Sequence, residues 1–262
     1  MIKLVKRFVR FILDYFRVKK ITKVYQNNQE FLIETRDKLG EEWNLINNFD
    51  YSEFQIFNKI NSDKINKVFY FGAHQSVIPI KIHKIFLKKA DFFCFEVIKK
   101  NFLISKENID LNDCRDRVKI FNEAISTING YDYFDPISLN SYKTKKNFLS
   151  KKVKSSDLET ILKKYGKGEL LYFDIEGLEG PVLEKSIKFL KTWKNNIFIE
   201  AHGLAYTERY NYSNKKLYRL LVDNGYEFLK LKDDFHKSEE KFFKVVNSNE
   251  IPEKRFYCYA YN

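Results

Sequence analysis

The stretch Val68-Phe69-Tyr70-Phe71-Gly72-Ala73-His74 is an apolar run that leads directly into a glycine. A continuous run of this kind, rich in aromatic residues, predicts a strand that is buried on both faces. Residues 76–89 follow with apolar side chains at helical spacing, so a strand, a glycine loop and a helix succeed one another. This order predicts the first unit of a parallel sheet whose ligands bind at the carboxyl ends of its strands.

The same alternation continues along the chain. Further short apolar runs occupy residues 92–95, 118–121, 170–173 and 197–200, and the segments with helical spacing are 97–111, 157–164, 179–192 and 215–224. The last two strands, 226–231 and 255–261, have no helix between them, which predicts an antiparallel pair at the edge of the sheet. We therefore predict an α/β fold with a mostly parallel, Rossmann-like sheet and an antiparallel C-terminal edge.

Residues 1–63 have a different pattern. They are predicted to form an N-terminal helical extension, and residues 64–262 the Rossmann-like domain. The extension is expected to contain helices over 1–20 and 21–39, the second ending at a glycine, and a helical stretch over 41–60. Because no Pro-, Gly- or Ser-rich linker separates the two parts, we expect the extension to pack against the domain.

The charge and cysteine content of the chain restrict its binding partners and its location. The chain has 262 residues, with 47 Lys and Arg against 35 Asp and Glu and a formal net charge of +12. The lysines are spread along the whole sequence, without an Arg-rich arm or an RNA-binding aromatic signature, so we expect no nucleic-acid partner. The three cysteines are too few and too scattered for a disulfide framework or a zinc cluster, which favours reduced thiols and a cytoplasmic location.

Residues 1–20 combine a stripe of apolar side chains with a basic stripe at helical spacing. Lysines and arginines interrupt the segment too often for a transmembrane span or a secretory signal. Two interpretations stay open. The helix either caps the domain with its basic side in water, or it lies on an anionic membrane surface and makes the protein peripheral at the inner face of the membrane.

Polar residues with a chemical role are expected where the strands end. Gly72 lets the backbone approach a ligand closely, and the following helix offers free amide donors. Glu96 ends the second strand, 24 residues after Gly72, which is the position and separation expected of an acid that binds the ribose of a nucleotide-like cofactor. Gly72 and Glu96 together therefore predict a cofactor site.

Two later strands also end in polar residues. Asp174 and Glu176 suit a base, a metal ligand or a hydroxyl binder, whereas Glu179 is explained by the start of the next helix. Glu200 and His202 share one side of an extended strand, and a histidine there is a candidate general base. Carboxylate oxygens of Asp174 and Glu200 would suit Mg²⁺, but their spacing is not diagnostic and we predict no metal.

These strand-end motifs resemble those of the FkbM family of methyltransferases. The element Asp174-Ile175-Glu176-Gly177-Leu178-Glu179 is the most specific part of the resemblance, which covers about residues 66–230. The other matching residues are Phe71-Gly72-Ala73, Phe95-Glu96, Asn108, Asn112, Asn122-Glu123-Ala124-Ile125-Ser126 and Ile199-Glu200-Ala201-His202. The resemblance implies a class I methyltransferase fold, S-adenosylmethionine as cofactor and, usually, O-methylation of a sugar or natural-product hydroxyl.

The resemblance also implies the position of the cofactor. The family's cofactor-binding positions fall on Gly72, Ala73, His74 and Glu96, with Asn122, Glu123 and Ala124 near the adenine. The chain departs from the family pattern at four positions: Tyr70 replaces an acid, His74 and Ser76 replace an asparagine and a second glycine, and Tyr172 replaces a lysine. An acid at position 70 would help to hold the amino group of the cofactor, a charge that tyrosine does not supply.

The leading hypothesis is an O-methyltransferase that acts on a saccharide or glycoconjugate. A hydroxyl is a poor nucleophile until a base removes its proton, so we expect His202 to be the base, with Asp174 as the alternative. Glu176 and Glu200 would orient substrate hydroxyls or the base. In the segment 131–148, the aromatic residues Tyr131, Tyr133, Phe134 and Tyr142 are either platforms for sugar rings or part of a surface hairpin.

Two rival hypotheses come from other classes. The departures at Tyr70 and His74 would suit a catalytically degenerate, methyltransferase-fold binding protein. The basic charge would suit an RNA methyltransferase, although Asp135-Pro136-Ile137-Ser138 lacks the second proline of the signature for base amino-group methylation. If residues 1–20 reach a membrane, the acceptor would be a lipid-linked or surface-polysaccharide precursor.

Overall fold

The computed structural model describes residues 9, 19–36, 40–41, 52–58, 60–135, 143–146, 150–231 and 242–262. Most of the amphipathic segment 1–20 lies outside the described residues, as does Tyr142. Within the described part of the chain, no helix is both long and apolar enough to span a bilayer.

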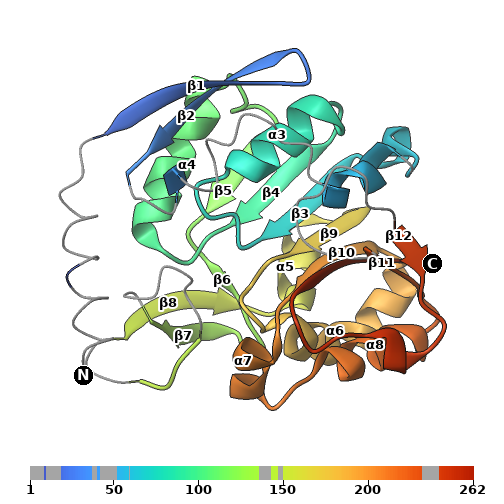
Figure 1. Ribbon diagram of the computed structural model, residues 1–262. Helices are drawn as coiled ribbons and strands as arrows, with labels where there is room; N and C mark the ends of the chain where they lie inside the picture. The colour runs from blue at the N-terminus through green and yellow to red at the C-terminus, as the bar shows by residue number, and fades with distance from the viewer. Residues whose placement is uncertain are drawn as a thin grey trace.

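An eight-stranded sheet forms the centre of the molecule, with the strand order β12-β11-β13-β10-β9-β3-β4-β5 (Figure 1). The five strands that the sequence predicts to be parallel are so: β3 (Lys67–Phe71), β4 (Asp91–Phe95), β5 (Val118–Phe121), β9 (Leu170–Phe173) and β10 (Asn196–Ala201). The predicted antiparallel pair is confirmed as β11 (Glu227–Leu231) and β13 (Phe256–Tyr261). The short strand β12 (Phe242–Lys244), which we did not predict, extends this edge.

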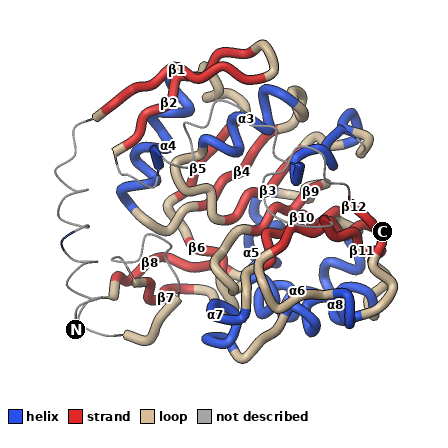
Figure 2. The backbone as a smooth tube through the Cα atoms, viewed as in Figure 1, coloured by secondary structure: helices blue, strands red, loops and turns tan. Residues whose placement is uncertain are grey.

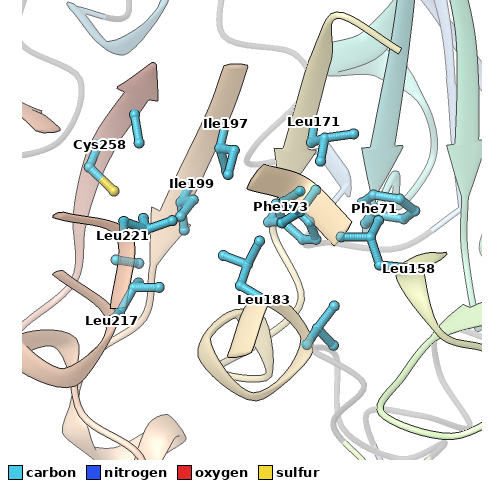
Figure 3. Packing of buried hydrophobic residues seen from close by; sticks show 14 of the residues in the cluster. Phe71, Leu158, Leu171, Phe173, Leu183, Ile197, Ile199, Leu217, Leu221 and Cys258 are labelled. Atoms are coloured by element: carbon cyan, nitrogen blue, oxygen red, sulfur yellow. The ribbon is translucent and has the colours of Figure 1, made fainter. Parts of the chain in front are cut away.

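Helices cover both faces of the sheet because the side chains of each strand alternate between the faces. One apolar layer contains Val68 of β3 with residues of α3 (Val77–Ile85) and α4 (Lys99–Leu111). The opposite layer contains Phe69 and Phe71 with residues of α5 (Leu158–Tyr165), α6 (Glu179–Trp193) and α8 (Asn214–Val222). Figure 3 shows labelled side chains from these strands and helices meeting in this second layer. The two layers fix the strand ends that carry the polar residues.

The prediction of a helix over residues 21–39 is wrong. Strands β1 (Lys20–Gln26) and β2 (Gln29–Thr35) form an antiparallel hairpin there, and it lies along α4 (Figure 2). The turn residues Asn27 and Asn28 both have positive φ, 46° and 58°, a conformation that asparagine tolerates and that matches the twist of a two-residue hairpin. The expected packing is confirmed, since Val24, Phe31 and Ile33 join the apolar layer of α3 and α4.

Part of the helical stretch predicted over 41–60 is present as the 3₁₀ helix Ser52–Asn58, whose Phe54 and Phe57 are buried. A second, three-stranded sheet follows β5 and was not predicted. It pairs β6 (Ala124–Ile125), β8 (Lys151–Ser156) and β7 (Gly130–Phe134) in that order. The remaining elements are α7 (Leu204–Thr207) and the 3₁₀ helices Ser62–Lys64, Glu208–Tyr210 and Ser248–Glu250.

Candidate active site

Gly72 begins the loop after β3 with a φ of +88°. A Cβ atom at this position would lie 1.7 Å from the backbone oxygen of Asp174, so no other residue fits without moving the backbone. The Asp174 amide in turn donates to the Phe71 oxygen at 3.0 Å. The glycine therefore brings the ends of β3 and β9 into direct contact, and with them the predicted cofactor and catalytic motifs.

The rest of this loop also uses left-handed backbone. His74 has a φ of 48° and Ser76 a φ of 58°. Glycine and asparagine adopt this region most readily, which gives a physical reason for the family's preference at these two positions. Ser76 occupies the N-cap of α3, but its buried hydroxyl has no hydrogen-bond partner among the described residues. Both residues thus hold a left-handed backbone at a conformational cost.

Glu96, the predicted ribose binder, lies at the end of β4 and is only 5% exposed. Its Oε2 accepts from the His74 amide at 2.8 Å, and its Oε1 accepts from the Ile98 amide at 2.7 Å. Burial raises the pKa of Glu96 to about 8, although these backbone bonds act in the opposite direction. The carboxyl group joins the glycine loop to the start of α4, where the side chain of Asn101 also hydrogen-bonds to it, and the remaining lone pairs can accept from a hydroxyl donor.

The residues predicted near the adenine divide into two groups. Asn122 donates from Nδ2 to the backbone oxygen of Glu96 at 2.9 Å, so it lies beside the predicted ribose position. Glu123 instead contacts β8, where it pairs with Lys154 Nζ at 2.9 Å and accepts from the Ser156 hydroxyl. Ala124 is completely buried in β6. The adenine role of Glu123 and Ala124 stays a prediction.

His202 is the centre of a group of carboxylates at the ends of β9 and β10. Its Nε2 lies 3.6 Å from Asp174 Oδ1 and 3.5 Å from Glu176 Oε2. The same nitrogen lies 3.9 Å from Glu200 Oε1. The structure therefore brings together all four residues that the sequence predicts as catalytic or orienting. Of these acids, Asp174 has the most exposed side chain, at 28%.

Glu179 has a larger role than the helix-start function we predicted. Its Oε1 lies 2.9 Å from His202 Nδ1 and also accepts from the amides of Ile175 and Gly177 at 3.0 and 3.2 Å. A tight turn makes this possible, since Glu176 and Gly177 have φ values of 58° and 94°. The signal was present in the sequence, because Glu179 is the last acid of the motif that carries the family resemblance.

The charges around His202 change its acid–base properties. Burial alone would lower its pKa, but Glu179, Glu176 and Asp174 together raise the pKa of His202 to about 10. Burial raises the pKa of Glu176 to about 7 and also raises that of Asp174. Because these groups are close together, the protonation of each one affects the pKa of the others. The cluster therefore contains one group that titrates near pH 7, Glu176, and one that titrates near pH 10, His202.

Two residues from the C-terminal strand region complete the cluster, and the sequence reasoning missed both. The Arg255 guanidinium pairs with Glu200 Oε1, and the Tyr257 hydroxyl donates to Glu200 Oε2 at 2.9 Å. Arg255 precedes β13 and Tyr257 lies in it, next to β10. Nothing in the local sequence marks them, because their role depends on the pairing of β13 with β10.

Asp174, Glu200 and His202 are also, within the described residues, a group that could hold a metal ion, with one ligand atom from each lying within 4.8 Å of the others. The contact between Arg255 and Glu200 places a fixed positive charge at this group. Arg255 would therefore repel a cation bound here, whereas the carboxylates of Asp174 and Glu176 would attract it.

Tyr70 of β3 and Tyr172 of β9, two of the residues that depart from the family pattern, face each other. The two residues are register partners, and their rings stack with centroids 4.1 Å apart. Both are 2% exposed, and Phe198 of β10 stacks on Tyr172 at 4.7 Å. Neither ring carries a charge, so the stack fills this part of the core without an unpaired charge.

The aromatic residues of the segment 131–148 are not equivalent. Tyr131 is 58% exposed, with Lys152 Nζ 4.2 Å from its ring centre, and Tyr133 is half-buried. Phe134 is buried and does not offer an exposed platform. The segment does contact Tyr210, whose hydroxyl accepts from the Lys143 amide at 3.1 Å, and burial, with smaller contributions from the charges of Glu179 and Glu176, raises the pKa of this hydroxyl.

A family model described as the methyltransferase FkbM domain matches residues 50–228. No curated protein matches the chain. One similar solved structure is the precorrin-6y C5,15-methyltransferase of Geobacter metallireducens GS-15, which is 12% identical, with 80% of this chain and 88% of that chain covered and a TM-score of 0.45.

Another is the methyltransferase FkbM of Methylobacillus flagellatus KT, which is 14% identical, with 75% of this chain covered and a TM-score of 0.44. The match covers 44% of that longer chain. A third is the METTL16 methyltransferase domain, 12% identical, with 80% and 64% of the two chains covered and a TM-score of 0.45.

Proposed function

The chain belongs to the FkbM methyltransferase family, and on that basis we propose that it transfers a methyl group from S-adenosylmethionine to a hydroxyl of a saccharide or glycoconjugate. The family membership makes the chain a methyltransferase. The observation that supports methylation of a hydroxyl is the contact between His202 and Glu179, because it supplies the base that a hydroxyl needs.

The residues at the ends of β3, β4 and β5 fit the cofactor. Gly72 and Ala73 would let the backbone approach it, and Glu96 would accept from the ribose hydroxyls through the lone pairs that the amides of His74 and Ile98 leave free. Asn122 lies beside Glu96. When bound, the cofactor supplies a methyl group already activated by its sulfonium.

Proton transfer is the task of the acid cluster. Glu179 holds Nδ1 of His202, which leaves Nε2 directed toward Asp174 and Glu176. A carboxylate at Nδ1 fixes the ring and stabilises the imidazolium that forms when Nε2 takes a proton. Asp174, the more exposed acid, would accept a hydrogen bond from the acceptor hydroxyl and hold it near Nε2. Arg255 and Tyr257 keep Glu200 in place.

The proposal of a saccharide acceptor rests on two features. Asp174 and Glu176 offer carboxylate oxygens, which suit the several hydroxyl donors of a sugar ring. Tyr131 and Tyr133 lie in β7 of the small sheet, and the ring of Tyr131 is exposed. A flat ring face packs well against the apolar face of a sugar.

A catalytically degenerate binding protein is the second candidate. The observation that favours it is the low exposure of Glu96, whose two oxygens already accept backbone amides. The stack of Tyr70 on Tyr172 keeps the sheet core packed, although it does not supply the charge that an acid at position 70 would offer to the cofactor. An RNA methyltransferase is the third and weaker candidate, and salt-sensitive retention of RNA would support it.

The test is methyl transfer from labelled S-adenosylmethionine to a panel of saccharides, lipid-linked glycans and RNA. We expect label in a saccharide or glycoconjugate with the wild-type chain and a loss of about 10²–10⁴-fold with His202→Gln. Calorimetry with S-adenosylhomocysteine should show that His202→Gln still binds. Cofactor binding without transfer to any acceptor would support the degenerate protein, and label in RNA alone would contradict a saccharide acceptor.

We also propose a cytoplasmic location, with peripheral contact at the inner membrane face through residues 1–20 as the alternative. Co-sedimentation with vesicles that contain anionic lipids, compared between the full chain and a chain lacking residues 1–18, tests it. Equal behaviour of the two chains would contradict membrane contact through this segment.

A further inference from the structure

The N-terminal hairpin is attached to α4 by two asparagine side chains. The Leu32 amide donates to Asn112 Oδ1 at 3.1 Å, and Asn112 Nδ2 donates to the Leu32 oxygen at 2.7 Å. In the same way, the Glu34 amide donates to Asn108 Oδ1 at 2.6 Å, and Asn108 Nδ2 donates to the Glu34 oxygen at 3.3 Å. Each asparagine amide therefore takes the place of a peptide group in a neighbouring strand.

The spacing explains why this arrangement fits. Residues two apart in a strand, such as Leu32 and Glu34, are separated by about 6.8 Å along it, and residues four apart in a helix, such as Asn108 and Asn112, by about 6 Å. The two asparagines thus satisfy the free edge of β2, which would otherwise expose unpaired backbone groups.

Asn108 makes one more contact, and this contact leads to the glycine loop. Its Nδ2 also donates to the Gln75 oxygen at 3.0 Å, and the side chain is completely buried. Asn112 directs its other bond to the Asn108 oxygen, within its own helix, at 2.8 Å. The two asparagines hold the same hairpin, but Asn108 connects it to the loop that follows β3.

The glycine loop depends on such contacts because its backbone is unfavourable on its own. Gln75 lies between His74 and Ser76, which are both left-handed. Ser105 of α4 donates to the His74 oxygen at 2.8 Å, so side chains of α4 hold the two consecutive carbonyls of His74 and Gln75. Glu96 holds the His74 amide from the other side.

We propose that Asn108 is a positioning residue for the cofactor: it ties the N-terminal hairpin to the glycine loop and keeps that loop in its binding conformation. The proposal rests on the proposed function, in which residues 72–76 hold S-adenosylmethionine. Asn108 acts through the backbone of Gln75 rather than by touching the cofactor. The hairpin is then part of the cofactor site although it lies outside the main sheet.

The test compares Asn108→Ala with the matched control Asn112→Ala in the full chain. Both variants lose a pair of bonds to β2, so both should lower the thermal midpoint. We expect Asn108→Ala to weaken S-adenosylhomocysteine binding by about tenfold, the effect of one buried hydrogen bond, and to raise the KM for S-adenosylmethionine with little change in kcat. Asn112→Ala should leave both quantities within about twofold. Asn108→Ser is the milder variant if Asn108→Ala does not fold.

A second readout needs no cofactor. Hydrogen exchange of the His74 and Ser76 amides should be about tenfold faster in Asn108→Ala than in Asn112→Ala. Equal exchange and equal affinity in the two variants would overturn the proposal. If the wild-type chain bound no cofactor, the proposed function would fail, and with it the cofactor role of Asn108, whereas an exchange difference would still establish its hold on the loop.

Discussion

At the scale of single residues, Ser76 combines two unfavourable features. Its φ of 58° is costly for any residue with a Cβ, and its buried hydroxyl has no partner among the described residues. We expect Ser76→Gly to raise the free energy of unfolding by about 1 kcal/mol, because glycine removes both costs. Urea denaturation measures it. Ser186→Gly in the middle of α6 is the matched control and should lower stability by a similar amount.

The pKa of His202 predicts a pH dependence at the same scale. The neighbouring carboxylates raise this pKa to about 10, so near neutrality the imidazole is mostly protonated and only a small fraction can act as a base. The transfer rate should therefore rise with pH, by about tenfold per unit from about pH 7 to 9. Glu179→Gln removes the contact at Nδ1, lowers the pKa of His202 and should move the rising limb to lower pH. A flat profile in both proteins would contradict His202 as the base.

At the scale of secondary-structure elements, the Tyr70–Tyr172 stack links β3 and β9. Tyr70→Asp or Tyr172→Lys alone would leave an unpaired charge in the core, and each should lower the free energy of unfolding by about 3–5 kcal/mol. The double variant places the two opposite charges side by side, so its loss of stability should be smaller than the sum of the two single losses. A denaturant double-mutant cycle measures this coupling. Strictly additive losses would contradict the view that the two departures compensate each other.

Some of the secondary-structure elements could be predicted from the sequence and others could not. The parallel strands were predictable because short, continuous apolar runs such as 68–71, which ends at a glycine, favour a strand covered on both faces. The hairpin at 20–35 was missed because its turn has no glycine and depends on Asn27 and Asn28 adopting left-handed backbone. Strand β8 was missed because its first residues, Lys151 and Lys152, are both exposed, so no alternation marks it.

At the scale of the whole molecule, the gathering of Asp174, Glu176, Glu200 and His202 was predictable because parallel strands end at one edge of the sheet. Their partners were not, because the position of Arg255 depends on the pairing of distant strands. The cofactor loop was predictable as a motif from Gly72. Its support by Asn108 was not, because that contact depends on how α4 packs beside the loop.

The charge balance of the cluster predicts the effect of metal removal. Arg255 already neutralises Glu200, so the protein should not need a divalent cation. Methyl transfer after treatment with a chelator should stay within about twofold of the untreated rate, since an enzyme that relied on a metal for charge stabilisation would lose far more. Recovery of a lost rate by added Mg²⁺ would contradict this and would point to Asp174, Glu200 and His202 as ligands.

Calorimetric titration with S-adenosylmethionine and S-adenosylhomocysteine tests the central claim most directly, because every step proposed for this molecule requires the cofactor. We expect wild-type binding in the micromolar range and loss of binding in Glu96→Ala, whose fold is checked by its thermal transition. The Glu123→Ala variant is a useful control, since the carboxylate of Glu123 contacts Lys154 and Ser156. Absence of binding at millimolar cofactor would contradict the account and leave the chain as a binding protein with a methyltransferase fold.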